Sequence, residues 1–465
     1  MSFNTRRDFL KASGMVVMAG AAGFLGTEQY LYGQDEPSGT VSAAADRQKA
    51  TIVTIFLRGG ADALNAFVPV GDDGYYQARS RIALHTDGSA PSKGKRKAEG
   101  AGAILFDKNK YWAVNHRLAP LIPLIEAGEC AAIMNAGSTN GTRSHFSAQD
   151  YMERGVPGDI GVNSGWLNRY LELTKKPFDA PLRGLSAQTL VPRALRGSYP
   201  VLAGNNSTEQ MELFENLYSA KNMVNMNARQ DSNDQKGSRL DDLGSKMGPQ
   251  GLTSDMTRDI IAQSGANAIE RIKALEKASM TENSAEYPSG GLAHQLSAIA
   301  RVIKADVGLE CAQADYGGWD THSGQGGADG RHSQMLGHLA DSLVAFRTDL
   351  GKRMDRVLVL VMTEFGRTVH DNGASGTDHG RAGFMIAMGD MIKPVSAKTG
   401  PILGQWNGMA DLDGGRFLPV HTDFRGVMAE SLWKLYHVDP IKSKIFPDFN
   451  NKASVLDFLK PLPEV

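Results

Sequence analysis

The chain has 465 residues, 41% of them hydrophobic and 22% charged, which is ordinary for a soluble globular protein with one large domain or two smaller ones. Lysine and arginine total 50, aspartate and glutamate total 51, and the formal net charge is -1. The basic surplus typical of nucleic-acid binders is missing, so we expect no nucleic-acid partner.

The N-terminal residues have the pattern of an export signal. Arg6 and Arg7 precede Phe-Leu-Lys and the uncharged stretch GMVVMAGAAGFLG, which is too short to span a bilayer. A chance arginine pair before a buried helix is the alternative. The pattern favours a twin-arginine signal peptide and linker over residues 1–45, with cleavage after SAAA or after LYG. We therefore expect a periplasmic or otherwise exported protein that uses the twin-arginine machinery and has no membrane span in its mature chain.

Residues 46–465 are predicted to form one catalytic domain in which strands alternate with helices. The expected strands are short apolar runs that end in glycine or polar residues, at 50–58, 130–138, 307–318, 356–367 and 383–390. The expected helices have apolar residues spaced by three and four, at 118–128, 292–305 and 333–351. Near-continuous apolar strands in such an alternation predict an α/β fold, with a doubly wound, mostly parallel sheet and helices on both faces.

Two polar segments interrupt this alternation. Residues 85–105 are charged and glycine-rich, which indicates an exposed insertion, and residues 205–290 are predicted to form a polar helical and loop insertion, either a surface excursion or a lid. Cys130 and Cys311 each lie in an apolar run, so we expect buried free thiols, although a single bridge stays open.

Acidic and histidine side chains follow several of the expected strands. Ligands bind at the carboxyl ends of the strands in open parallel sheets, so these residues are expected to meet at one edge. A hydrogen-bonded loop is the alternative for any single pair. Taken together they predict a site for Zn, Mn, Mg or Ca. The candidate ligands are Asp62, Asp320, His322, Glu364, Asp378 and His379.

The segment TRSHFSAQDYMERG is predicted to contain a helix start. Ser147 and Asp150 have the spacing of a capping box, and the free N–H groups of a first helical turn favour anions. Ser144 is therefore a candidate nucleophile, with Thr142 as its substitute, and Arg143 is a candidate for holding the anionic group. Alternatively Ser144 caps the helix and Arg143 pairs with a local acid.

Three further side chains were considered for this site. Arg367 follows the expected strand at 356–367 and is predicted to steady the anionic group together with Arg143. His145 and His116 are interpreted either as donors behind the ligands or as residues that begin helices, and the second interpretation is preferred.

The motifs FLRGGADALN, TRSHFSAQDYMERG, GGWDTH, MTEFGRT and GTDHGRAG, in this order behind a twin-arginine leader, closely resemble a secreted bacterial family of unknown function, number 1501 of the domain-of-unknown-function series. The resemblance extends from about residue 50 to the C-terminus. That family is in turn similar to the alkaline phosphatase and sulfatase superfamily. The resemblance implies an alkaline-phosphatase-like fold, one or two metals and hydrolysis of phosphate or sulfate esters.

Position by position, the resemblance places Asp62 as the acidic ligand after the first strand and Ser144 as the nucleophile. It also implies that Asp320 and His322 are a ligand pair, and it leaves His421 as a further candidate ligand. Glu364-Phe365 departs from the superfamily's adjacent Asp-His or Asp-Asn, and Asp378-His379 follows downstream instead. The sequence has no stretch with the Cys/Ser-x-Pro-x-Arg spacing that a formylglycine sulfatase needs.

We therefore expect an exported metal-dependent hydrolase of small-molecule or glycan esters of phosphate or sulfate. One alternative is a non-catalytic exported module that binds a glycan or a protein on the same scaffold. A metal-dependent mutase is the other.

Overall fold

The computed structural model describes most of the chain from residue 50 onward. The leader predicted over 1–45, residues 87–101 of the expected insertion and residues 205–269 of the expected polar segment lie outside the described residues. No helix in the described part is long and apolar enough to cross a bilayer. The described residues are 50–86, 102–106, 109–158, 161–176, 179–204, 270–271, 273–393, 402–440, 442–450 and 456–462.

A nine-stranded sheet forms the centre of the described chain, with the strand order β11-β5-β10-β9-β1-β8-β6-β7 and with β12 paired to β5. Every pairing in it is parallel except those of β10, which is antiparallel to both β5 and β9. The expected mostly parallel sheet is confirmed. The strands are β1 (Thr51–Arg58), β5 (Cys130–Gly137), β6 (Gly184–Ser186), β7 (Leu202–Ala203), β8 (Cys311–Gly317), β9 (Val357–Thr363), β10 (Gly383–Met388), β11 (Ile402–Leu403) and β12 (Thr422–Asp423).

A small antiparallel sheet and the helices complete the described fold. The small sheet has the order β2-β4-β3, with β2 (Phe67–Val68), β3 (Ala103–Leu105) and β4 (Ala113–Asn115). The α-helices are α2 (Asp73–Ala78), α3 (Ile122–Glu126), α4 (His145–Arg154), α5 (Trp166–Leu173), α9 (Gly291–Lys304), α10 (Arg331–Leu350) and α11 (Phe424–Tyr436). Short 3-10 turns are η1 (Ala63–Asn65), η2 (His116–Leu121), η3 (Arg193–Leu195) and η4 (Gly351–Arg356).

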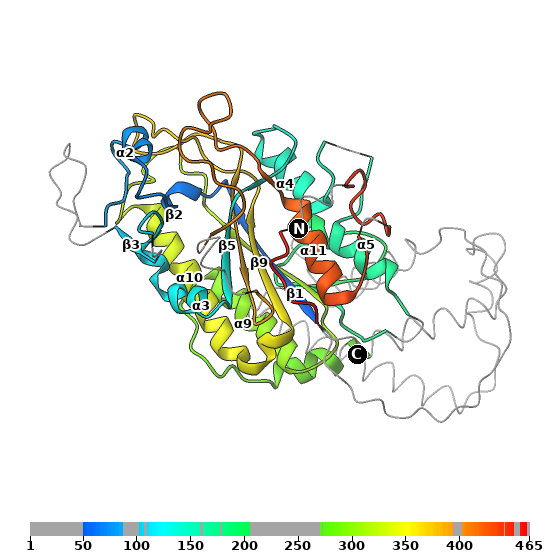
Figure 1. Cartoon of the computed structure of the whole chain (residues 1–465). Coiled ribbons are helices and arrows are strands. Elements are labelled where there is room, and N and C mark those ends of the chain that lie inside the picture. The colour runs from blue at the N-terminus through cyan, green and yellow to red at the C-terminus, as the bar shows by residue number, and fades with distance from the viewer. Residues whose placement is uncertain are drawn as a thin grey trace, which may run out of the picture.

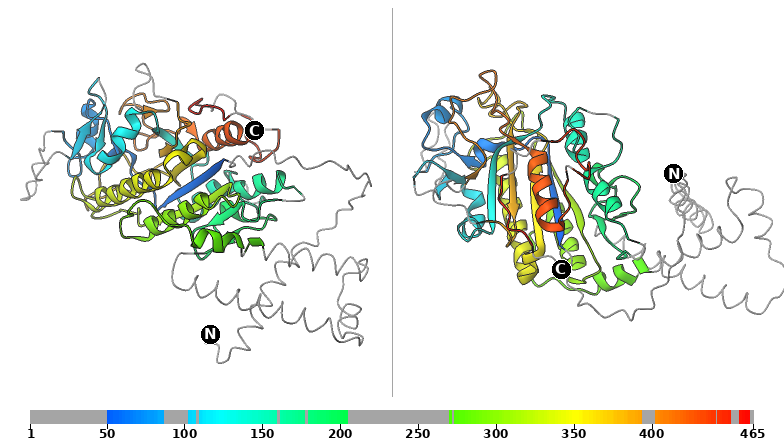
Figure 2. Two further views of the ribbon diagram at one scale, coloured as in Figure 1. Left: turned by 90° about the horizontal axis from the view of Figure 1, so that it is seen from below. Right: turned by 45° about the vertical axis from the view of Figure 1, so that its right-hand side comes forward.

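Helices cover both faces of the central sheet, as the alternation of strand residues requires (Figure 1). Val53, Ile55 and Leu57 of β1 pack in one core with α9 and α10, and Ile52 and Phe56 pack in a second core with α5 and α11. The right-hand view of Figure 2 shows α11 lying in front of the strands. Each fully buried Val, Ile, Leu or Phe stabilises the fold by about 1.5–3 kcal/mol, so both faces anchor β1 firmly.

The direction of the strands decides which loops meet. Strands β1, β8 and β9 are parallel and in register, with Arg58 beside Gly317 and Leu57 beside Thr363, so their carboxyl ends share one edge. Strand β5 ends at the same edge because β10 is antiparallel to both β9 and β5. The same reversal brings the amino end of β10 to this edge, so the loop before β10 joins the loops after the other strands.

A candidate metal centre at the strand ends

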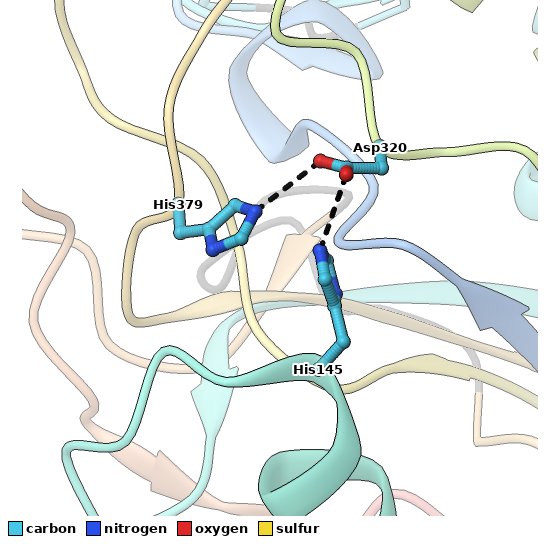
Figure 3. A group of neighbouring side chains, drawn as sticks. All are labelled: His145, Asp320 and His379. Atoms are coloured by element: carbon cyan, nitrogen blue, oxygen red, sulfur yellow. Dashed lines mark hydrogen bonds and ion pairs between the residues drawn. The ribbon is translucent and has the colours of Figure 1, made fainter.

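Three chain segments bring one aspartate and three histidines together at this edge. His145 is the first residue of α4, which follows β5; Asp320 and His322 follow β8; and His379 lies in the loop before β10. Figure 3 shows the side chains of His145 and His379 directed toward the carboxylate of Asp320. Ligand atoms of His145, Asp320 and His379 all lie within 4.8 Å of one another. We call His145, Asp320, His322 and His379 the histidine cluster.

The Nε2 atoms of all three histidines face the Asp320 carboxylate. Asp320 Oδ1 is 3.2 Å from Nε2 of His322 and 3.2 Å from Nε2 of His379, and Asp320 Oδ2 is 3.4 Å from Nε2 of His145. The Nε2 atoms of His322 and His379 are 2.9 Å apart. Four donor atoms from distant parts of the chain thus surround one small volume.

Each Nδ1 atom, by contrast, is held by an oxygen that can only accept a hydrogen bond. Nδ1 of His145 donates to Glu364 Oε1 at 2.7 Å, and Nδ1 of His322 donates to Asp378 Oδ1 at 2.9 Å. Nδ1 of His379 donates to the backbone carbonyl of Arg143 at 2.8 Å. These bonds fix the tautomer with the proton on Nδ1, so every neutral imidazole presents its Nε2 lone pair to the cluster. In metal sites, hydrogen bonds to the other ring nitrogen orient the histidine ligands in this way.

The donor spacing fits a small divalent cation. Around zinc, with bonds of about 2.0–2.2 Å in tetrahedral geometry, neighbouring donors lie roughly 3.3 Å apart, close to the spacings found here. Two facing Nε2 lone pairs 2.9 Å apart repel each other unless they share a proton or a cation. Nε2 of His145 is buried and has no hydrogen-bond partner among the described residues. Its lone pair is therefore available to a cation.

The charge around the cluster also favours a cation. Asp320, Glu364 and Asp378 supply three carboxylates, and of these Arg367 contacts Asp320, donating to its Oδ1 at 2.8 Å. Two negative charges therefore remain uncompensated by this arginine. A divalent cation would balance them.

The pKa shifts follow from the same contacts. Burial opposes ionisation of Asp320, but the hydrogen bond and charge of Arg367 outweigh it and hold the pKa of Asp320 below its usual value. The hydrogen bond that His145 donates to Glu364 raises the pKa of His145, whereas burial lowers the pKa of His379. Glu364 is itself held ionised, because the hydrogen bonds from His145 and Gln149 overcome its burial and lower its pKa.

Arg367 joins the loops that carry the cluster and does not face solvent. Its buried guanidinium donates to the carbonyls of Gly59, Gly60, Trp319 and Thr377 as well as to Asp320. The Arg367 side chain is 0% exposed, so its guanidinium donates inward and is not open to an anion arriving from solvent. This corrects the prediction that Arg367 steadies the anionic group of a substrate.

Gly59 permits the closest approach of two of these loops. Its φ is +125°, and a Cβ built on it would lie 2.4 Å from the backbone nitrogen of Asp320. The N–H of Gly59 also donates to Glu364 Oε1 at 2.8 Å. A larger residue here would push the Asp320 loop away from β1, so the GG of the LRGGAD motif is needed for backbone geometry.

Asp62 lies in a separate buried network. It is 1% exposed and forms an ion pair with Arg79, and Oδ1 accepts a second bond from that guanidinium at 2.9 Å. Gln325 donates to its Oδ2 at 2.5 Å, and the backbone N–H of Asp62 donates to Nε2 of His332 at 3.1 Å. No contact in the described chain joins Asp62 to the histidine cluster. The predicted ligand role of Asp62 is therefore corrected to that of a buried ion-pair partner.

Two further predicted ligands lie behind the histidines. Glu364 Oε1 accepts from His145, Gln149 and Gly59, and Asp378 Oδ1 accepts from His322 and Asn372. Both carboxylates orient an imidazole, whereas the sequence interpretation made them direct ligands. The sequence interpretation preferred His145 as a residue that only begins a helix, whereas its Nε2 faces the cluster. Its position directly after a strand-end loop is the same signal that selected the other candidates.

The start of α4 differs from the capping-box prediction. The helix begins at His145 with Ser144 at the N-cap, three residues before the predicted Ser147, and the Ser144 side chain makes no capping hydrogen bond. Ser144 is exposed, and its backbone N–H donates to Thr142 Oγ1 at 3.3 Å. The guanidinium of Arg143 lies 5.0 Å from the centre of the Phe417 ring, and no described acid pairs with it. The side chains of Ser144 and Arg143 are thus available beside the cluster.

Two other histidines considered from the sequence lie elsewhere. Nε2 of His116 contacts the carbonyl of Ala328 at 3.0 Å, as the preferred structural interpretation expected. Nε2 of His421 contacts Asp411 Oδ2 at 2.8 Å, and His421 has no contact with the histidine cluster in the described residues. Both Cys130 and Cys311 are buried free thiols, as predicted.

Comparison with known proteins identifies the family. Residues 49–412 match the family described as Protein of unknown function (DUF1501). No curated protein sequence is significantly similar to the chain. The match covers most of the chain and contains every member of the histidine cluster. The chain therefore belongs to the DUF1501 family.

Proposed function

We propose that this protein is an exported, divalent-metal-dependent hydrolase of phosphate or sulfate esters with an alkaline-phosphatase-like fold. One observation carries the proposal: three Nε2 atoms and one carboxylate, from three loops at one edge of the sheet, converge while each Nδ1 is held from behind. Structural hydrogen bonding alone would not need three lone pairs directed at one carboxylate. The twin-arginine leader pattern supports export, and the alternation of strands and helices supports the proposed fold class.

The donor chemistry narrows the choice of metal. Imidazole nitrogen suits zinc and, with carboxylate, manganese, whereas calcium and magnesium prefer sites made entirely of oxygen. We therefore propose zinc or manganese, held by Nε2 of the three histidines and by Asp320. The bound cation would supply Lewis-acid polarisation of a phosphoryl or sulfuryl oxygen.

The chain's own residues then have distinct roles. Glu364, Asp378 and the carbonyl of Arg143 keep the proton of each imidazole on Nδ1. The guanidinium of Arg143 binds the non-bridging oxygens of the ester. The hydroxyl of Ser144, which is free of any capping bond, attacks phosphorus or sulfur; the bond to the alcohol oxygen breaks as the Ser144 Oγ bond forms, and the hydroxyl proton passes to the departing alcohol. Water then cleaves the seryl ester, which releases phosphate or sulfate and restores the serine.

Metal analysis and ester turnover together test the proposal. Exported protein should contain zinc or manganese and should hydrolyse at least one aryl phosphate, phosphodiester or aryl sulfate. Asp320→Ala and His322→Ala should lose both metal and activity. His116→Ala should keep both, because His116 bonds the carbonyl of Ala328 outside the cluster.

The outcomes separate the alternatives. Protein without metal would refute the proposal. Metal without turnover of any ester would favour a binding module, and rearrangement of a phosphate ester without phosphate release would favour a mutase. Ser144→Ala should abolish turnover yet retain metal, whereas Ser147→Ala on the same helix should keep both.

A further inference from the structure

An open cavity of about 450 Å³, lined by both polar and apolar side chains, lies among the loops at one end of the central sheet. This volume is within the range of small-molecule binding sites. We call it the Arg381–His421 cavity. Its lining residues are Thr139, Arg381, Asp411, Leu412, Asp413, Pro419, Val420 and His421.

Two residues that line the cavity lie close in the sequence to members of the histidine cluster. Thr139 lies in the connection from β5 to α4 that ends at His145. Arg381 follows His379 by two residues, just before β10. The cavity and the cluster therefore share two loops, the connection from β5 to α4 and the loop before β10.

The cavity wall carries basic side chains that are each paired with a carboxylate, so it offers both hydrogen-bond donors and acceptors. Arg381 forms an ion pair with Asp413, and His421 contacts Asp411 at 2.8 Å. Asn407 also donates to Asp411, at 2.8 Å. Because each carboxylate has a basic partner, the wall attracts neither anions nor cations strongly. It suits a neutral group with several hydroxyls, each of which can donate to a carboxylate and accept from an N–H.

One donor on this wall lacks a partner. Nε of Arg381 is buried and has no hydrogen-bond partner among the described residues. A buried N–H of this kind needs an acceptor, and a ligand hydroxyl in the cavity would supply one.

We propose that the Arg381–His421 cavity binds the polyhydroxylated alcohol part of the substrate, and that this part is a saccharide unit. The saccharide lies in the cavity while its phosphate or sulfate group reaches the histidine cluster. The identification of the ester rests on the proposed function, but the binding of a neutral saccharide does not.

Binding is measured first on the full mature protein. Methyl glucoside, methyl galactoside and N-acetylglucosamine are titrated by saturation-transfer NMR. At least one should bind, and Asp411→Asn and Asp413→Ala should each weaken its binding by about tenfold or more, the usual effect of losing a hydrogen bond to a charged group. Asp341→Ala, at an exposed position on α10, should bind as the parent protein does. Unchanged binding in both cavity variants, or no binding of any probe to the parent, would overturn the proposal.

Kinetics provide the second readout. For a sugar phosphate or sugar sulfate, Asp411→Asn should raise KM about tenfold with little change in kcat, while KM for an aryl phosphate should stay the same. Equal changes for both substrates would overturn the proposal, because they would show that the cavity acts through the cluster. If no ester is turned over but saccharide binding is lost in the variants, the proposed hydrolase activity fails and the cavity assignment stands.

Discussion

Replacing Glu364 by glutamine tests the role of the carboxylate behind the cluster. Glu364 Oε1 accepts from Nδ1 of His145 at 2.7 Å, from Gly59 at 2.8 Å and from Gln149 at 3.0 Å. Glutamine keeps the size of the side chain but removes the charge that favours the Nδ1–H tautomer and strengthens Nε2 as a donor. Loss of a carboxylate that hydrogen-bonds to a metal-binding histidine typically weakens metal binding 10- to 100-fold. This corresponds to about 1.4–2.7 kcal/mol of binding free energy.

The assay is zinc affinity, measured by competition with a chelator of known strength. Glu153→Gln is the matched control, because Glu153, in α4, is also buried but bonds Arg58 and Gln313 instead of a histidine. We expect Glu364→Gln to weaken zinc binding by 10- to 100-fold and Glu153→Gln to leave it nearly unchanged. Equal affinities for parent and Glu364→Gln, or an equal loss in both variants, would refute the assignment of Glu364 as the residue that orients His145.

Three further predictions address stability and the approach of the substrate. Asp62→Ala leaves the guanidinium of Arg79 buried and unpaired. It should lower the free energy of unfolding, measured in urea, by about 3–5 kcal/mol without altering the metal content. Loss of metal at unchanged stability would contradict the structure. Burial lowers the pKa of His332 from 6.5 to about 4, so between pH 4 and pH 6.5 the unfolded chain binds more protons than the folded chain. The contribution of His332 to the free energy of unfolding should be full above pH 6.5 and should fall by up to roughly 3 kcal/mol as the pH drops toward 4. His332→Asn should flatten that part of the urea stability profile, and an unchanged slope would assign it to other groups. Arg143→Ala should raise KM for an aryl phosphate about tenfold with no change in melting temperature, since Arg143 is exposed; an unchanged KM would exclude it from anion binding.

Local patterns in the sequence were sufficient to find five strands of the central sheet and the loops that carry the cluster. The runs at β1, β5, β8, β9 and β10 are apolar because both faces of the sheet are covered, and that pattern is visible without coordinates. The rule that strand ends meet at one edge then selected Asp320, His322 and His379 correctly as neighbours. The sequence did not show that β10 is antiparallel, since strand direction leaves no mark in an apolar run.

The roles of the polar residues were decided by contacts between distant segments. His145 and Glu364 are 219 positions apart, and only their meeting makes the first a cluster member and the second its hydrogen-bond partner. Arg79 lies 17 residues after Asp62, and η1 and α2 turn the chain so that the two side chains pair in the interior. The amino-acid sequence of this protein, through its apolar strands and the polar residues that follow them, therefore identified residues that reach the sheet edge. Tertiary structure alone decided which of them face the shared centre, because hydrogen-bond partners and burial depend on how loops pack and not on residue type.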